Sequence, residues 1–202
     1  MHVCVPTLTC IPTVTDQHSG TRGAEIWDPD TEEWTLLDTK HQVPRTYHSI
    51  ALLLPDATVL TGGGGLCGPC GVNHADAEVF YPPYLFAPDG TRVAASTRPT
   101  VELSARRAQH GDDVTVTSSQ PMKMVSMVRF GTVTHSTNTD QRRVELCGPR
   151  TAACGGTEAR IKVPEDPGVA VGGNWMVFAI NEAGVPSVAA TLHIDLRGPT
   201  PA

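Results

Sequence analysis

Between Arg45 and Gly65 the sequence reads RTYHSIALLLPDATVLTGGGG, and this stretch decides the fold class. Two short apolar runs, Ile50–Leu54 and Val59–Leu60, are separated by a Pro-Asp turn and followed by four glycines. Runs of this length with turn residues between them predict short β-strands. Similar runs recur later in the chain, at Ala77–Phe80, Val114–Val116, Met124–Phe130, Trp175–Ile180 and Val188–Ile194. Helical periodicity is almost absent, so the sequence predicts an all-β protein.

One internal repeat frames this stretch. AEIWDP at Ala24–Pro29 recurs as AEVFYP at Ala77–Pro82, with an offset of 53 residues. A period of about 50 residues with four short strands per unit is the signature of a kelch β-propeller. Trp34 follows the first copy, as expected for the strand pair of a kelch blade. We therefore predict that residues 21–94 are a kelch-propeller remnant of about one blade, with residues 1–20 unassigned.

The composition of the chain changes near Ala94–Pro99. After this point, roughly seven strand candidates follow in about a hundred residues, and the repeat does not recur. That size and spacing predict an immunoglobulin-like β-sandwich. The predicted fold is a partial kelch propeller (residues 21–94) followed by this sandwich (residues 95–198).

Composition and charge exclude several classes of protein. The 202 residues carry 15 Lys and Arg against 21 Asp and Glu, a net charge of −6, which argues against a general nucleic-acid binder. No stretch approaches the ~18 apolar residues of a membrane span. Residues 1–15 have neither the basic region nor the continuous apolar run of a signal peptide.

The six cysteines fall into three closely spaced pairs, which suits an oxidising compartment. This conflicts with the missing signal peptide unless the chain is a fragment of a longer protein. Cys147 and Cys154 are predicted to form a disulfide that closes a short hairpin loop, whereas the pairing of Cys4 and Cys10 stays open.

The Cys67-Gly-Pro-Cys70 motif has three interpretations. A redox pair needs its first cysteine at a helix N-terminus, and here glycines surround the motif. A zinc site with His74 lacks a second CxxC to complete it. A small structural disulfide that pins the loop is the favoured interpretation.

Three residues could bind a metal, although the spacing alone is weak evidence. Tyr47 and His48 are adjacent, and neighbours in a regular strand point to opposite faces, so a shared metal would require a strand end or a bulge. The ordinary alternative is a half-buried aromatic ring beside an exposed histidine. His135 lies in a polar loop, where a single histidine is usually only solvated. His74, Asp76 and Glu78 alternate towards a strand and are interpreted as its solvated face.

Three separated motifs resemble the C-terminal part of the galactose oxidase/glyoxal oxidase family of copper radical oxidases. They are RTYHSIALLLPDATVLTGGGGLCGPCGVNHADAEVFYPPYLF, VRFGTVTHSTNTDQRR and NWMVFAINEAGVPSVA, and they occur in the family's order. The resemblance covers about residues 22–196. It implies a kelch propeller followed by an immunoglobulin-like early set domain, one loop of which delivers a copper ligand, and a secreted, extracellular protein.

The resemblance also implies a set of copper ligands. Tyr47 matches the axial tyrosine, and His48 and His135 match the two copper-binding histidines. Imidazole suits Cu(II), and Tyr47 would accept the hydroxyl proton of the substrate as general base. Cys67 and Cys70 match a short structural disulfide of the family.

The implied activity is oxidation of a small primary alcohol or aldehyde, with O₂ reduced to H₂O₂. The family's redox cofactor, a tyrosine cross-linked to a cysteine, has no counterpart in this chain. The copper site is therefore expected to be incomplete, and this chain is expected to be inactive alone. One alternative is a non-catalytic immunoglobulin-like binding or structural module with a remnant blade, and another is a domain stabilised by zinc at the CxxC.

Overall fold

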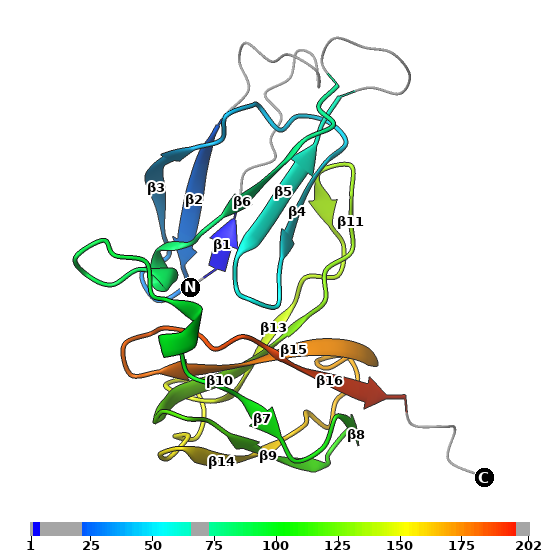
Figure 1. The fold of residues 1–202 in the computed structure, drawn as a ribbon. Coiled ribbons are helices and arrows are strands. Elements are labelled where there is room, and N and C mark those ends of the chain that lie inside the picture. Colours follow the sequence, from blue (N-terminus) through cyan, green and yellow to red (C-terminus); the bar gives the residue numbers. More distant parts are fainter. Residues whose placement is uncertain (1, 5–21, 66–72, 197–202) are drawn as a thin grey trace. The chain divides into compact units, whose positions relative to one another are not determined.

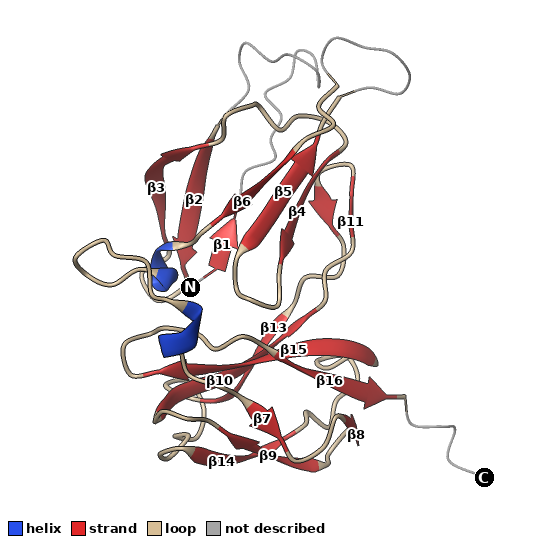
Figure 2. Ribbon diagram, viewed as in Figure 1, coloured by secondary structure: helices blue, strands red, loops and turns tan. Residues whose placement is uncertain are grey.

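The computed structural model describes residues 2–4, 22–65 and 73–196 of the chain. The regular structure of these residues is almost entirely β-strand, with two short 3₁₀ helices, η1 (Pro83–Leu85) and η2 (Ala95–Thr97) (Figure 2). The prediction of an all-β protein is confirmed. Neither described helix has the length and apolar character that a membrane crossing requires.

The chain divides into two compact units, each built from separate stretches. Unit 1 comprises Met1–Leu54, Thr58–Pro82 and Gly131–Asp140, and unit 2 comprises Pro55–Ala57, Pro83–Phe130 and Gln141–Ala202. The loop that carries His135 thus belongs to unit 1, whereas the boundaries predicted from the sequence place it with the sandwich.

Unit 2 is a β-sandwich. One sheet has the strand order β13-β10-β15-β16-β8 and the other the order β14-β9-β7 (Figure 1). Strands β16 and β8 pair in parallel, and the other strand pairs described in these two sheets are antiparallel. The strands are β7 (Glu102–Leu103), β8 (Arg107–Gln109), β9 (Asp113–Thr117), β10 (Met122–Arg129), β13 (Arg143–Cys147), β14 (Glu158–Lys162), β15 (Gly173–Asn181) and β16 (Ala190–Asp195).

The hydrophobic core of unit 2 follows from the period-two alternation of its strands. Val114 and Val116 of β9 are buried while the residues flanking them are more exposed, as expected for a strand with one face on the core. Trp175 of β15 is fully buried, and its indole N–H donates to the carbonyl oxygen of Val171 at 3.0 Å. The predicted immunoglobulin-like sandwich is confirmed.

Two further features tie this sandwich together. Cys147, the last residue of β13, forms a disulfide with Cys154, and their Cα atoms lie 5.1 Å apart. The buried guanidinium of Arg98 donates to the carbonyl oxygens of Asp56, Pro186 and Ser187 at 2.7–2.8 Å. These bonds satisfy a charge that would otherwise be costly to bury.

The described residues of unit 1 form two antiparallel three-stranded sheets and a short hairpin (Figure 1). The two copies of the AE-x-x-x-P repeat contribute β2 and β6, one to each sheet. The assignment of these sheets to a kelch blade stays a prediction. The strands are β1 (His2–Cys4), β2 (Gly23–Asp28), β3 (Glu33–Lys40), β4 (Ser49–Leu53), β5 (Val59–Gly63), β6 (Ala77–Phe80), β11 (Val133–Thr134) and β12 (Thr137–Asn138).

The β4–β5–β6 sheet provides the platform on which the candidate site is built. Its strands pair in the order β4-β5-β6, and the β11–β12 hairpin packs beside β4 (Figure 1). Ser49, the first residue of β4, pairs with Gly63, the last residue of β5. The turn before β4, the end of β5 and the hairpin therefore meet at one end of this sheet.

Candidate metal centre

Tyr47 and His48 lie in the turn that enters β4. The Ser49 N–H donates to the carbonyl oxygen of Thr46 at 3.1 Å and closes the turn. His48 has a φ of 65°, a left-handed backbone state that few non-glycine residues adopt. The two rings lie 3.9 Å apart between centroids, so the bend brings together neighbours that a regular strand would separate.

His135 occupies the tip of the β11–β12 hairpin. Val133 pairs with Asn138 and Thr134 with Thr137, which leaves His135 and Ser136 as a two-residue turn. Both turn residues have positive φ, 52° and 64°, as a type I′ turn requires. This turn normally uses Asn-Gly, because a left-handed backbone costs other L-residues roughly 1–2 kcal/mol each.

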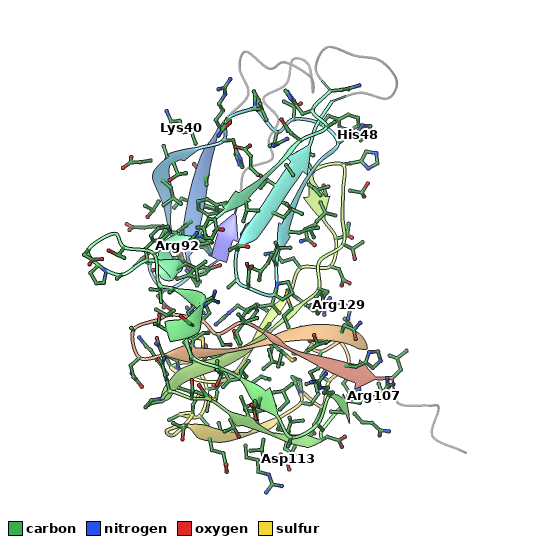
Figure 3. The ribbon with its side chains drawn as sticks, viewed as in Figure 1. Lys40, His48, Arg92, Arg107, Asp113 and Arg129 are labelled. Atoms are coloured by element: carbon green, nitrogen blue, oxygen red, sulfur yellow. A yellow bond between two sulfur atoms is a disulfide. The ribbon has the colours of Figure 1, made fainter. Side chains whose placement is uncertain are left out.

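The three rings predicted to bind copper lie together in unit 1. The centroids of the His48 and His135 rings are 4.6 Å apart, and those of Tyr47 and His135 are 5.4 Å apart. Figure 3 shows the His48 side chain where the chain enters β4. Tyr47 and His48 are half-buried and His135 is exposed, so solvent and a solute can reach the cluster.

The donor set of this cluster fits copper. Two imidazoles and one phenol are nitrogen and oxygen donors of the kind that tetragonal Cu(II) accepts. The His135 Nδ1 lies 2.7 Å from the Thr134 hydroxyl, so its Nε2 is left for a metal, with the ring oriented by an outer hydrogen bond. Within residues 2–4, 22–65 and 73–196, no group of three His, Cys, Asp or Glu is arranged to hold a metal.

Arg45 braces the turn that carries Tyr47 and His48. Its side chain is 1% exposed and donates to the carbonyl oxygen of Gly63 at 3.0 Å, to Asp76 Oδ1 at 2.6 Å and to Glu78 Oε2 at 3.0 Å. Arg45 was not among the residues predicted for the site, and Asp76 and Glu78 were expected to form a solvated strand face. A basic residue two positions before Tyr47 and two alternating carboxylates at β6 were the available signal.

This ion-pair cluster shifts two acid groups. The hydrogen bond from Arg45 is the main cause that lowers the pKa of Asp76 below its ordinary value. Burial raises the pKa of Glu78, but hydrogen bonds from the Gln42 N–H and from Arg45 outweigh it, so this pKa also lies below its ordinary value. Both carboxylates therefore stay charged opposite Arg45 at neutral pH.

The glycines at the end of β5 and just after it lie close to the same turn. The Gly65 N–H donates to the carbonyl oxygen of Tyr47 at 2.7 Å. A Cβ on Gly63 would lie 3.3 Å from the His48 carbonyl oxygen, and one on Gly64 would lie 3.4 Å from the Thr46 nitrogen. Both glycines have positive φ, so glycine is needed here for close approach and for conformation. Cys67 and Cys70 lie outside the described residues.

Comparison with known proteins identifies the sandwich. Residues 98–194 match the family model of the galactose oxidase-like early set domain. This part of the chain is an early set domain of that family. The resemblance predicted from the sequence is thereby confirmed.

The similarity extends beyond the early set domain. The chain is 42% identical over 171 residues to a galactose oxidase of Gibberella zeae, an alignment that covers 84% of this chain and 24% of that protein. It is 35% identical over 168 residues to the aldehyde oxidase GLOX of Vitis pseudoreticulata, covering 77% of this chain and 31% of the relative. The chain thus spans about a quarter to a third of these relatives.

A solved structure gives the same relationship. A fungal alcohol oxidase of the AA5 family, described as having catalytic diversity and being in complex with copper, superposes with a TM-score of 0.75 at 44% identity. The match covers 86% of this chain and 36% of that chain. It therefore includes much of unit 1 as well as the early set domain.

Proposed function

We propose that this chain is the C-terminal part of a copper-dependent oxidase and that Tyr47, His48 and His135 hold the copper ion. The observation that carries the proposal is the convergence of these three rings, with centroids 3.9–5.4 Å apart, from segments 87 residues apart in the sequence. The copper complex of the similar fungal alcohol oxidase supports the choice of metal.

In the proposed reaction a primary alcohol, or an aldehyde in its hydrated gem-diol form, loses two electrons and two protons, and O₂ gains them to become H₂O₂. Bound copper would supply a redox-active Lewis acid beside the substrate oxygen. His48 and His135 would hold the ion through imidazole nitrogen, and Tyr47, as the phenolate, would accept the substrate's hydroxyl proton. The exposure of His135 leaves an approach for a small solute.

We do not expect this chain alone to catalyse the oxidation. A two-electron oxidation with a copper ion that changes charge by one needs a second redox centre, and none of Tyr47, His48 and His135 supplies it. We propose that the copper site here is incomplete and that the chain binds Cu(II) without catalysing the oxidation. We also propose an extracellular location, supported by the Cys147–Cys154 disulfide.

Copper titration of the purified chain tests the ligand assignment. His48→Ala and His135→Ala should each weaken Cu(II) binding by at least the roughly ten- to hundredfold that loss of an outer-shell partner costs. Tyr47→Phe should weaken it less, because both imidazoles remain. His193→Ala removes a histidine from β16 of unit 2 and should leave the affinity unchanged.

Two results would contradict the proposal. Unaltered Cu(II) binding in both histidine variants would show that His48 and His135 are not copper ligands. It would favour the alternative of a non-catalytic immunoglobulin-like module. Peroxide formation from an alcohol by the copper-loaded chain would overturn the claim that the site is incomplete.

A further inference from the structure

We propose that Ser49 and Ser136 are positioning residues that set the separation of the His48 and His135 rings before any metal binds. The inference rests on the proposed copper site, because it concerns how its two imidazoles are held. Each serine directly follows one of the histidines in the sequence, and the two serines are bonded to each other.

Three hydrogen bonds join the two segments. The Ser136 N–H donates to the Ser49 carbonyl oxygen at 3.0 Å, and the two serine Oγ atoms lie 3.1 Å apart. The Ser136 hydroxyl donates to the Thr46 carbonyl oxygen at 3.2 Å, so the Ser49 hydroxyl is the donor in the contact between the serines. The bonds therefore run from the strand start, through the hairpin tip, to the first residue of the Tyr47-His48 turn.

Burial makes the contact between the hydroxyls costly to lose. Ser49 is fully buried, and the Ser136 hydroxyl is the partner that the structure gives its side chain. A buried hydroxyl without a partner carries a desolvation penalty, whereas replacing both members of a bonded pair by apolar groups is much less costly. The effects of replacing the two serines on stability are therefore not independent. Replacing both together separates the cost of burying an unpaired hydroxyl from the role of the pair in positioning the histidines.

The β11–β12 hairpin needs this anchor. Its two strands have two residues each, and an isolated hairpin is at best marginally stable in water. His135 and Ser136 are both left-handed, a strained state that persists only where the surroundings hold it. The bonds of Ser136 to Ser49 and Thr46 supply that hold at the turn itself.

The serines act on the histidines through short covalent distances. Consecutive Cα atoms are about 3.8 Å apart, so fixing Ser49 and Ser136 against each other leaves the two imidazoles only their own side-chain rotations. A metal that meets a preset pair of ligands avoids the ordering cost of bringing them together. The expected consequence is a tighter and geometrically more uniform copper site.

The first test is copper binding by single variants. Ser136→Ala should raise the Cu(II) dissociation constant about tenfold, the lower end of what loss of an outer-shell partner costs, and should broaden or shift the Cu(II) electron paramagnetic resonance spectrum. Ser136→Gly removes the same hydroxyl but relieves the backbone strain at φ 64°. It should lose the same copper affinity as Ser136→Ala while being the more stable of the two variants. Thr139→Ala, which removes a hydroxyl bonded to Thr132 within the loop, should change neither readout.

The second test separates positioning from stability. The double variant Ser49→Ala/Ser136→Ala removes both hydroxyls of the pair, so neither is left buried without its partner, and its thermal midpoint should recover above that of Ser136→Ala. Its copper affinity and resonance spectrum should stay altered, because the two hydroxyl bonds of the anchor are still missing. Recovery of affinity and spectrum together with stability would overturn the proposal, as would a wild-type affinity in both Ser136 variants.

A metal-free measurement distinguishes failure of this inference from failure of the proposed function. Nuclear Overhauser contacts between the His48 and His135 ring protons should be present in the metal-free wild type and weakened in both Ser136 variants. Persistence of these contacts in the variants would overturn the positioning role. Contacts that weaken as expected, in a chain whose copper binding does not depend on His48 or His135, would overturn the copper site and leave the serine pair upheld.

Discussion

The side chain of Arg45 is buried, whereas those of its two acidic partners reach solvent. The exposed fraction of its side chain is 1%, against 57% for Asp76 and 25% for Glu78. A buried guanidinium is costly unless its charge is paired. The two terminal nitrogens of Arg45 are bonded, whereas its buried Nε has no hydrogen-bond partner among the described residues. Its hold on the Tyr47-His48 turn therefore depends on carboxylates that remain ionised.

Removal of this charge should weaken unit 1. Arg45→Met keeps much of the side-chain volume but removes the bonds to Gly63, Asp76 and Glu78. The free energy of unfolding of unit 1 should fall by about 2 kcal/mol. This is less than for a fully buried ion pair, because the carboxylates left behind reach water. Nuclear magnetic resonance signals of β4–β6, followed through thermal unfolding, should report it, while the signals of Trp175 in unit 2 should melt as in the wild type.

Acid should act on the same cluster. The pKa values of Asp76 and Glu78 lie below their ordinary values of 3.8 and 4.5, so the folded state binds fewer protons than the unfolded state. Their contribution to the stability of unit 1 is complete above about pH 5 and is lost as the pH falls below about 4. The pH dependence of the unit 1 melting point should flatten in this range in Arg45→Met, and an unchanged acid slope would contradict the assignment.

The sequence allowed some residues of the site to be named and not others. Tyr47, His48 and His135 were reached through the family resemblance, because their motifs are recognisable one by one. The Ser49–Ser136 bond and the Arg45 cluster were not, because each depends on contacts between segments far apart in the chain. Composition and spacing carry no information about which polar groups meet after folding.

At the scale of elements, the end of β5 lies so close to the Tyr47-His48 turn that little space is left between them. Gly63 pairs with Ser49 and has a φ of 68°, and a Cβ there would lie 3.3 Å from the His48 carbonyl oxygen. Gly90 has a similar φ of 82° but no neighbour within 4 Å of an added Cβ. The two glycines thus share a conformational cost and differ in crowding.

This difference gives a matched pair of variants. Gly63→Ala and Gly90→Ala should each cost about 1–2 kcal/mol for a left-handed alanine. Only Gly63→Ala should displace the His48 backbone, so only this variant should shift the His48 ring signals and weaken Cu(II) binding. Equal effects of both alanines on copper binding would show that crowding at the turn is unimportant.

The longer strands were predictable and the shortest were not. The apolar runs at Ile50–Leu54, Ala77–Phe80, Met124–Phe130 and Trp175–Ile180 correspond to β4, β6, β10 and β15. Strands β7, β11 and β12 have two residues each, too few for any period to show. These short strands are set by their partners and by turn geometry, which explains why the hairpin carrying His135 was expected only as a polar loop.

At the scale of the whole molecule, the segment between β6 and β7 is the expected site of first proteolytic cleavage. Arg92 is exposed there, whereas Arg98 is buried and its guanidinium is fully engaged with carbonyl oxygens. Trypsin should cut after Arg92, because its side chain is exposed. It should spare Arg98, which is buried and directly precedes Pro99, a bond that trypsin does not cleave.

The product should be a resistant fragment that begins at Val93 and retains the near-ultraviolet circular dichroism of Trp175. Arg92→Gln should abolish this first cut without changing the sandwich. Rapid degradation of residues 98–196 in the wild type would contradict the view that the early set domain is the stable folding unit.

The assignment of Gly131–Asp140 to unit 1 also has a consequence for the timing of biosynthesis. At about 5–20 residues per second, the 87 residues from His48 to His135 take a ribosome roughly 4–17 s to synthesise. During that interval the nascent chain exposes one imidazole of the pair without the other. If the proposed copper site is right, capture of copper by both histidines would be a late event, delayed until β10 has been made and the hairpin has returned to β4.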